Sequence, residues 1–188
     1  MREVKVDADK RLAYAQGGAL WSDFDTATTD KGLVSVGGTV SHTGIGGKQA
    51  QIPSLITGLI LGGGYGWLTG QYGLSIDNLV EATVIVADGR IVKANAKENS
   101  DLFWGIKGLA LKTRISHVGG GSNFGVISEF VVQLHPHRGK CFGGMIIFIA
   151  DKLVPLVAAL NKIWEKNSPK FAFSLAVAAP PPAFEVSP

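Results

Sequence analysis

Clusters of glycine are the part of this sequence best suited to chemistry. Glycine makes up 25 of the 188 residues and concentrates at positions 37–38, 44–47, 62–66 and 119–125. A backbone without Cβ approaches a ligand closely and can aim successive N–H groups at an anion such as a phosphate. The same residues also form tight turns in β-rich proteins. The sequence therefore leaves two hypotheses open, anion-binding loops and structural turns.

Two familiar nucleotide-binding motifs are incomplete in this chain. Gly46-Gly47-Lys48 resembles the end of a P-loop, but Gln49 stands where Ser or Thr is needed, and His42 where the first glycine is needed. Gly44-Ile45-Gly46 lacks both the preceding strand and the third glycine of a Rossmann fingerprint. Neither motif is predicted.

Histidine offers weaker candidates for chemistry. Pro136 separates His135 from His137, and no cluster of Cys or carboxylates accompanies them, so we expect no metal site. His42 and His117 have no Ser–Asp or Cys partner at a spacing typical of a catalytic triad. The sequence assigns no catalytic residue.

Cysteine usage, charge and hydropathy limit the classes of protein further. Cys141 is the sole cysteine, which excludes an intrachain disulfide and a thiolate metal cage, and its apolar neighbours predict that it is buried rather than reactive. The 18 basic and 15 acidic residues give a net charge of +3, with no run of basic residues that would favour nucleic acid. The longest apolar run, Cys141–Ala150, is far short of the ~20 residues that span a bilayer. The first ten residues lack the apolar core of a signal peptide. We expect neither a nucleic-acid partner nor a membrane.

The elements that must position the glycines follow from hydrophobic periodicity. Alternation over Val4–Gln16 predicts a hairpin, and Ala19–Lys31 has apolar residues at helical spacing before a stop at Gly32. Leu79–Ala94 places Asp88-Gly89 between two β-branched runs, the pair that a tight hairpin turn prefers. Between these elements, residues 33–66 show little periodicity.

The second half of the chain continues the pattern and then changes character. Asn99–Ile106 is predicted to be a short helix with Asn99 or Ser100 as N-cap, and Gly125–Leu134 a strand. Near Arg138 a second domain begins, with elements expected at Gly143–Ala150 (buried strand), Asp151–Lys166 (helix) and Phe171–Ala179 (strand).

Five motifs in order carry a resemblance to a known family: QGGALWSDFDTAT, GGTVSHTGIGG, LILGGGYGWLTGQYGLSIDNLVEATVIVADGRIV, NSDLFWGIKG and GGSNFGVISEFVVQLHP. Together they cover about Val4–Pro136. They resemble the FAD-binding domain of the vanillyl-alcohol-oxidase superfamily, specifically the fungal berberine-bridge-enzyme-like oxidoreductases.

The resemblance implies an α+β fold with two parts. Residues 1–137 would form the second subdomain of a PCMH-type FAD-binding domain whose N-terminal subdomain is missing. Residues 138–188 would begin a truncated α+β substrate-binding domain. Matched by motif, the implied FAD contacts are Gly37, Gly38, Thr39, Ser41, Thr43, Gly44, Gly46, Gly47, Gly64, Gly66, Asp77, Asn78, Gly125 and Val126. Asp77 and Asn78 could instead stabilise a turn.

The implied activity is that of an FAD-linked oxidoreductase, plausible in secondary metabolism. It would transfer a hydride from a small organic substrate to flavin N5, with dioxygen or another acceptor reoxidising the flavin. One alternative is an inactive truncated or mis-spliced fragment with little or no flavin binding. Another is a glycine-rich β binding module unrelated to flavin.

The chain departs from the family pattern in four places. The histidine that tethers the flavin, expected upstream of Val4, and the tyrosine base, expected downstream of Pro188, are both outside the sequence. Val40 stands where some relatives carry a second, cysteinyl tether. Two 11-residue segments, Lys48–Gly58 and Leu109–Gly119, interrupt flavin-contacting loops. We hypothesise that both are translated introns or gene-model errors, with a real pair of lengthened loops as the alternative.

Overall fold

The computed structural model describes residues 1–46, 59–108, 120, 123–166 and 168–176. The chain divides into two compact units, Met1–His137 and Arg138–Pro188. The inserted segments Lys48–Gly58 and Leu109–Gly119 lie outside the described residues, as does Gly47.

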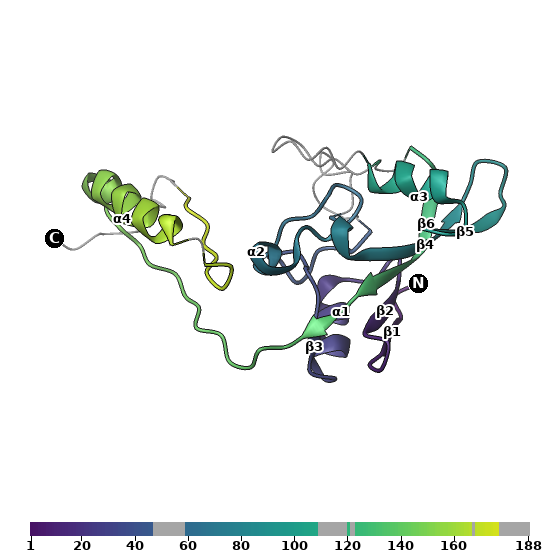
Figure 1. Cartoon of the computed structure of the whole chain (residues 1–188), viewed down its shortest axis with the longest axis horizontal. Helices are drawn as coiled ribbons and strands as arrows, with labels where there is room; N and C mark the ends of the chain where they lie inside the picture. Colours follow the sequence, from purple (N-terminus) through teal and green to yellow (C-terminus); the bar gives the residue numbers. More distant parts are fainter. Residues whose placement is uncertain (47–58, 109–119, 121–122, 167, 177–188) are drawn as a thin grey trace. The chain divides into compact units, whose positions relative to one another are not determined.

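A five-stranded antiparallel sheet organises the first unit (Figure 1). Its order is β1-β2-β6-β4-β5, with bounds Val4–Asp7, Leu12–Gln16, Val126–Gln133, Leu79–Ile85 and Ile91–Asn95. A second ladder pairs β3 (Leu33–Val34) with β7 (His135–Pro136). The mixture of this sheet with helices confirms the predicted α+β class.

Both predicted hairpins are present, and their turns explain the residues used. β1 pairs with β2 from Val4↔Ala15 to Asp7↔Leu12. β4 and β5 are joined through Asp88-Gly89, where Gly89 has a φ of +83° and its N–H donates to the Val86 carbonyl at 2.9 Å. Side chains with Cβ rarely adopt that region of φ, so the glycine suits the turn.

Both helices predicted in this unit are present, with ends one or two residues from the predicted ones. α1 (Trp21–Thr29) buries Trp21, Phe24 and Thr28 on one face, and Gly32 follows its end with a φ of +68°. α3 (Ser100–Lys107) has Asn99 as N-cap, although the Asn99 side chain donates to the Lys93 carbonyl at 2.7 Å instead of capping the helix. α1 packs against β1 and β3, and α3 against β4 and β5 (Figure 1).

The core lies around the central strand β6, which pairs with β2 on one side and β4 on the other. Phe130 is fully buried and stands directly opposite Ala15 and Ala82. The two small neighbours leave room for its ring. Trp21 and Phe24 from α1 join the same cluster, with their ring centroids 5.4 Å apart.

Two short helices complete the first unit. α2 (Thr69–Tyr72) and the 3-10 helix η1 (Ile76–Asn78) connect the glycine cluster at residues 62–66 to the start of β4. Ser75, Ile76 and Asn78 are buried there. This connection brings the predicted Asp77-Asn78 pair close to the glycines.

The described part of the second unit contains the helix α4, and the strands predicted at Gly143–Ala150 and Phe171–Ala179 are not formed by its described residues. α4 (Leu153–Glu165) follows the 3-10 helix η2 (Ala150–Lys152), as the helical spacing predicts. Residues 141–149 and 171–176 form no strand, however, and are exposed except for Phe173. A strand needs a partner edge for its N–H and C=O groups, and the described part of this unit supplies none.

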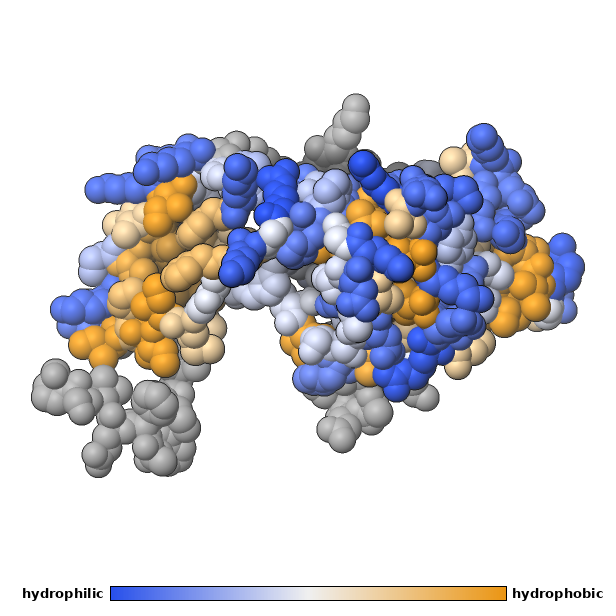
Figure 2. Space-filling model, turned by 90° about the horizontal axis from the view of Figure 1, so that it is seen from below, coloured by the Kyte–Doolittle hydropathy of each residue, from blue (hydrophilic) through white to orange (hydrophobic). Residues whose placement is uncertain are grey.

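Apolar side chains therefore remain on the surface of the second unit (Figure 2). Phe142, Ile146, Val154 and Trp164 are all more than two-thirds exposed. Cys141 is also exposed, which contradicts its predicted burial, because its apolar neighbours at 142–149 are themselves exposed. Within the described ranges, no helix is long and apolar enough to cross a membrane.

Candidate functional site

The glycine clusters at residues 37–38 and 62–66, though separated in sequence, meet backbone to backbone. A Cβ at Gly66 would overlap the carbonyl oxygen of Gly37. A Cβ at Gly37 would lie 2.7 Å from Cε3 of Trp21, and one at Gly38 would lie 3.2 Å from both Leu59 Cδ2 and Trp21 Nε1. The absence of side chains at these glycines thus allows close packing of chain segments.

The loop that follows Gly38 is docked on the start of α1 through its carbonyl groups. The Trp21 N–H donates to the Thr43 carbonyl at 3.0 Å, and the Ser22 N–H to the Ser41 carbonyl at 2.7 Å. Ile45 N–H donates to the Ala19 carbonyl at 2.9 Å. The first N–H groups of the helix are therefore taken up by this loop.

The amide groups of the same loop are used differently. No backbone N–H from residue 38 to 42 donates a hydrogen bond to any other described residue. Thr39, Val40, Ser41 and His42 are exposed. Five consecutive residues, beginning with the second glycine of the Gly37-Gly38 pair, thus carry N–H groups that are available to an anionic ligand. The structure thus supports both hypotheses for the glycines, since some of them pack and the loop after them presents free donors.

A hollow of about 280 Å³ adjoins the same glycines. Gly37 and Gly38 line it, together with Trp67, Leu68 and Asp25 among others. Trp67 is 52% exposed, so an aromatic surface lies next to the loop. In the neighbouring core, the indole Nε1 of Trp21 is buried without a hydrogen-bond partner among the described residues.

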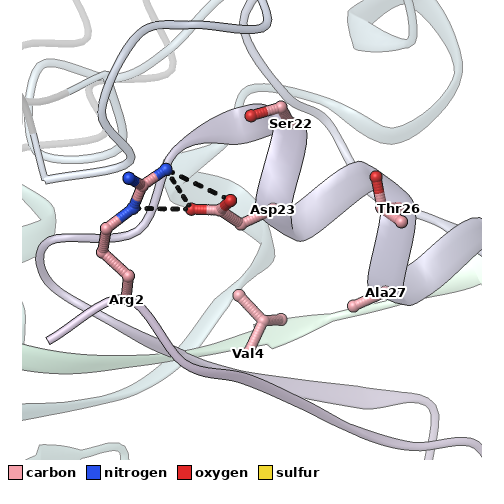
Figure 3. A pocket seen from close by; sticks show the side chains of 6 residues that line it. All are labelled: Arg2, Val4, Ser22, Asp23, Thr26 and Ala27. Carbon is pink, nitrogen blue, oxygen red and sulfur yellow. Dashed lines mark hydrogen bonds and ion pairs between the residues drawn. The ribbon is translucent and has the colours of Figure 1, made fainter.

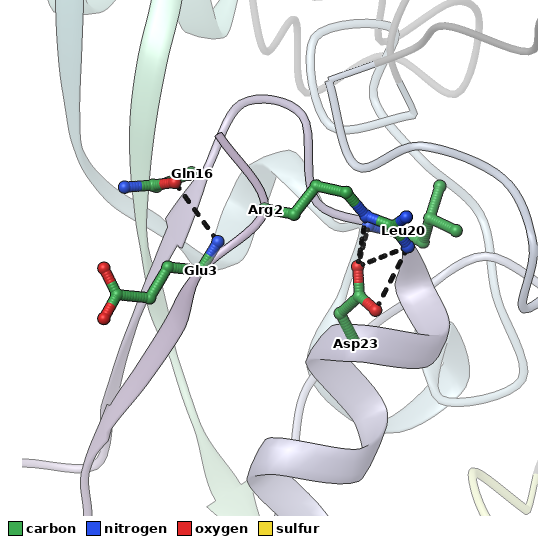
Figure 4. A network of polar contacts seen from close by, with 5 residues as sticks. All are labelled: Arg2, Glu3, Gln16, Leu20 and Asp23. Carbon is green, nitrogen blue, oxygen red and sulfur yellow. Dashed lines mark hydrogen bonds and ion pairs between the residues drawn. The ribbon is translucent and has the colours of Figure 1, made fainter.

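An ion pair between Arg2 and Asp23 lies at the start of α1 (Figures 3 and 4). The Arg2 guanidinium donates to both Asp23 carboxylate oxygens at 3.0–3.2 Å, and Asp23 also accepts the Leu20 N–H at 2.9 Å. The hydrogen bond from the Leu20 N–H makes the largest contribution to lowering the pKa of Asp23, and the hydrogen bond from Arg2 lowers it further. Arg2 also lines a hollow of about 410 Å³, but Asp23 neutralises its charge there. We assign this pair a structural role.

Asp77 and Asn78 both make contacts of the kind expected for a turn. Asp77 accepts the Leu74 N–H at 2.8 Å, and Asn78 Nδ2 donates to the carbonyls of Tyr72 and Leu74 at 3.0 and 2.8 Å. These two bonds identify Nδ2, so Asn78 Oδ1 is the acceptor of the 2.7 Å bond from Nε2 of His135. As flavin contacts, both residues remain a prediction.

His135, on β7, connects this turn to the two-stranded ladder of β3 and β7. Its ring stacks on Tyr72 with centroids 3.8 Å apart and planes 5° from parallel. Burial, and to a lesser degree the charge of Arg11, lowers the pKa of His135, so the neutral ring is favoured. The sequence suggested no partner for this histidine, because Asn78 lies 57 residues away.

Replacing Asn78 by alanine is expected to destabilise the protein in the absence of any ligand. It removes three hydrogen bonds and leaves the Tyr72 carbonyl and the His135 Nε2 without this partner, whereas the Leu74 carbonyl keeps the Asp77 N–H at 3.1 Å; the loss costs about 2–3 kcal/mol. Urea unfolding without flavin measures this loss. Asp77→Asn, which keeps an oxygen for the Leu74 N–H on an exposed side chain, is the matched control and should change stability little. Equal stability of the two variants would contradict the assigned role of Asn78.

The remaining predicted contacts lie elsewhere on the sheet. Val126 begins β6 opposite Ile85, the last residue of β4, whereas Asn78 immediately precedes the first residue of that strand. Gly125 has a φ of +138° and packs against the Ile85 carbonyl. Gly44 and Gly46 lie beside the chain at residues 17–20, where Gly44 bridges Leu20. The predicted residues thus fall into separate groups, and Asp77-Asn78 and Gly125-Val126 are at opposite ends of β4.

Sequence reasoning missed Ser75, whose hydroxyl connects the glycine clusters. Its Oγ donates to the Val36 carbonyl at 2.7 Å, and its N–H to the Gly64 carbonyl at 2.9 Å. Ser75 lies within the third family motif, two residues before Asp77, but the motif gave no sign that its hydroxyl bonds a carbonyl 39 residues away. In the described ranges, no three His, Cys, Asp or Glu side chains gather as a metal site requires.

Comparisons with known proteins show which family the chain resembles. The family model described as FAD binding domain matches residues 1–95. The FAD-linked oxidoreductase pgmH of Aspergillus terreus is 39% identical over 163 residues, covering 87% of this chain and 28% of that protein. The chain thus spans little more than a quarter of the length of this relative.

Solved structures lead to the same family. The crystal structure of 6-hydroxy-D-nicotine oxidase from Arthrobacter nicotinovorans superposes with a TM-score of 0.70 at 28% identity, covering 88% of this chain and 32% of that one. The VAO-type flavoprotein MtVAO615 from Myceliophthora thermophila gives a TM-score of 0.56 at 27% identity, over 72% of this chain and 22% of that one. With the matched domain and the antiparallel sheet, these similarities establish that the chain belongs to the FAD binding domain family of VAO-type flavoproteins.

Proposed function

We propose that this chain forms an FAD-binding surface of an oxidoreductase that oxidises a small organic molecule. The observation that carries the proposal is the row of five backbone N–H groups at residues 38–42, next to the packed glycines, that donate to no acceptor among the described residues. A pyrophosphate is an anion rich in acceptors, and aligned amides can bind it without a basic side chain. The residues present therefore fit FAD.

Some residues of this surface would bind the FAD pyrophosphate, and others pack the two glycine segments together. The N–H groups of Gly38, Thr39 and Ser41 would hold the pyrophosphate, and the hydroxyls of Thr39 and Ser41 add further donors. Gly37 and Gly66 bring the segments together beneath them. Val40, 42% exposed on this loop, has no thiol, so no cysteinyl bond to the flavin can form at this position.

Bound FAD would supply hydride acceptance from a substrate C–H bond at flavin N5, with dioxygen or another acceptor taking the electrons onward. This chain would orient the cofactor. The unit at 138–188 would begin the substrate-binding domain, which is consistent with its uncovered apolar helix α4. The nicotine oxidase similarity supports a small-molecule substrate.

Titration of the purified chain with FAD tests the proposal directly. We expect saturable binding with flavin absorbance near 450 nm, and about 2.7 kcal/mol of added stability when FAD is present at 100 times its dissociation constant. If the free amides bind the pyrophosphate as proposed, FAD should bind at least about tenfold more tightly than riboflavin, which lacks this group. Arg90→Ala, on the exposed β4–β5 turn, is the control and should bind FAD like the unmodified chain.

The possible outcomes separate the alternatives. A colourless protein that no flavin stabilises would contradict FAD binding and favour a fragment without cofactor. Equal affinity for FAD and riboflavin would keep the flavin site but contradict the role of the amide row.

A further inference from the structure

We infer that Ser75 is a positioning residue that couples the two glycine segments, residues 36–38 and 63–66, into one FAD-binding surface. The inference rests on the proposed function and names the side chain on which the geometry of that surface depends. Ser75 is 1% exposed and lies in the connection between α2 and η1.

Ser75 contacts both segments at the same time. Its Oγ donates to the Val36 carbonyl at 2.7 Å, across 39 residues of sequence. Its own N–H donates to the Gly64 carbonyl, and the Ile76 N–H to the Gly63 carbonyl, both at 2.9 Å. Residues 75–76 therefore bind the segment 36–38 through a side chain and the segment 63–66 through the backbone.

The fit between Ser75 and Gly64 is close. Gly64 has a φ of +80°, and a Cβ built on it would lie 2.5 Å from both Cβ and Oγ of Ser75. The Gly64 position is thus determined by the serine side chain as well as by its backbone. On the other side of the same contact, Gly66 lies against the Gly37 carbonyl.

The Ser75 hydroxyl has no substitute in this contact. Within the described part of the chain, no other side-chain hydrogen bond reaches residues 36–38. The free amide row begins at Gly38, two residues after the carbonyl that Ser75 binds. Loss of the hydroxyl would leave the Val36 carbonyl buried without this partner and release the start of the row.

Ser35 offers a matched control. It is 6% exposed, and its Oγ donates to the Gln133 carbonyl at 2.9 Å. The chemistry is the same as at Ser75, a buried hydroxyl on a backbone carbonyl, and the position is adjacent to Val36. This bond, however, ties the chain to β6 and not to the second glycine segment.

The experiment compares Ser75→Ala with Ser35→Ala in the full chain. Both variants should lose a similar amount of stability, because each loses one buried hydrogen bond. Ser75→Ala should raise the dissociation constant for FAD about tenfold, whereas Ser35→Ala should change it less than about twofold. Binding is measured at a temperature where both variants are folded.

Amide hydrogen exchange without flavin provides a second, independent measurement. Ser75→Ala should speed exchange in residues 36–42 and 63–66 together, and Ser35→Ala should not affect residues 63–66. Ser75→Cys, which retains a weaker donor, should be intermediate and replaces the alanine variant if that one does not fold.

Each outcome bears on a defined claim. Equal effects of the two alanine variants on exchange, or equal effects on FAD affinity, would overturn the role of Ser75. If the unmodified chain binds no FAD, the proposed function fails, and the exchange pattern alone decides whether Ser75 couples the segments.

Discussion

Gly66→Ala is expected to lower the free energy of unfolding by about 3 kcal/mol or more, because its Cβ would overlap the carbonyl oxygen of Gly37. The obstructing atom belongs to the backbone, so no side-chain rotation can relieve the contact. The two glycine segments would have to separate, and FAD binding should be lost with them. Urea unfolding and FAD titration measure the two effects.

Gly89→Ala is the control for this substitution. Gly89 has a φ of +83°, but no atom lies within 4 Å of its Cβ position. Alanine there should cost only about 1 kcal/mol of backbone strain. FAD affinity should be unchanged. A Gly66→Ala variant no less stable than Gly89→Ala would show that the close approach of Gly66 to Gly37 does not exist in solution.

Phe130→Ala is expected to lower the free energy of unfolding by about 3–5 kcal/mol, by opening a cavity in the centre of the sheet. Phe130 is fully buried on β6, opposite Ala15 and Ala82, and neither alanine can fill the space of its ring. The ring also approaches Gly46, since a Cβ there would lie 3.6 Å from Phe130 Cε2. The cavity would therefore also weaken the support of the glycine loop.

Two further substitutions test whether the loss of stability arises from the burial of Phe130. Phe130→Leu keeps most of the volume and should cost less than about 1.5 kcal/mol. Trp104→Ala removes a larger aromatic side chain that is 62% exposed on α3, and it should fall within about 0.5 kcal/mol of the unmodified chain. Chemical denaturation of the three variants gives the comparison. A Phe130→Ala loss no larger than that of Trp104→Ala would place the core elsewhere.

Local signals predicted most of the first unit. The hairpin at Asp88-Gly89 follows from turn chemistry, and the helix before Gly32 follows from the spacing of its buried residues. These features depend on residues close in sequence, so a local pattern is enough. The strands expected at Gly143–Ala150 and Phe171–Ala179 are not formed in the described residues, because strand formation also needs a partner edge.

The candidate site was predicted less completely, for a related reason. The family motifs identified the glycine loops but not which glycines pack and which residues present amides. Gly66 touches Gly37 from 29 positions away, and Asn78 binds His135 from 57 positions away. Neither spacing belongs to a helix or a strand, so no periodicity reveals it.

The sequence by itself determined the α+β class, the hairpins and helices of the first unit, and the family to which the chain belongs, because turn residues, periodicity and ordered motifs are local properties of a chain. Only the tertiary structure decided that Ser75 joins the two glycine segments, that Asn78 is held by His135, and that the N–H groups of residues 38–42 find no acceptor in the described part of the chain. The physical reason is that a hydrogen bond or a backbone contact is fixed by distance in space, which the path of the whole chain determines.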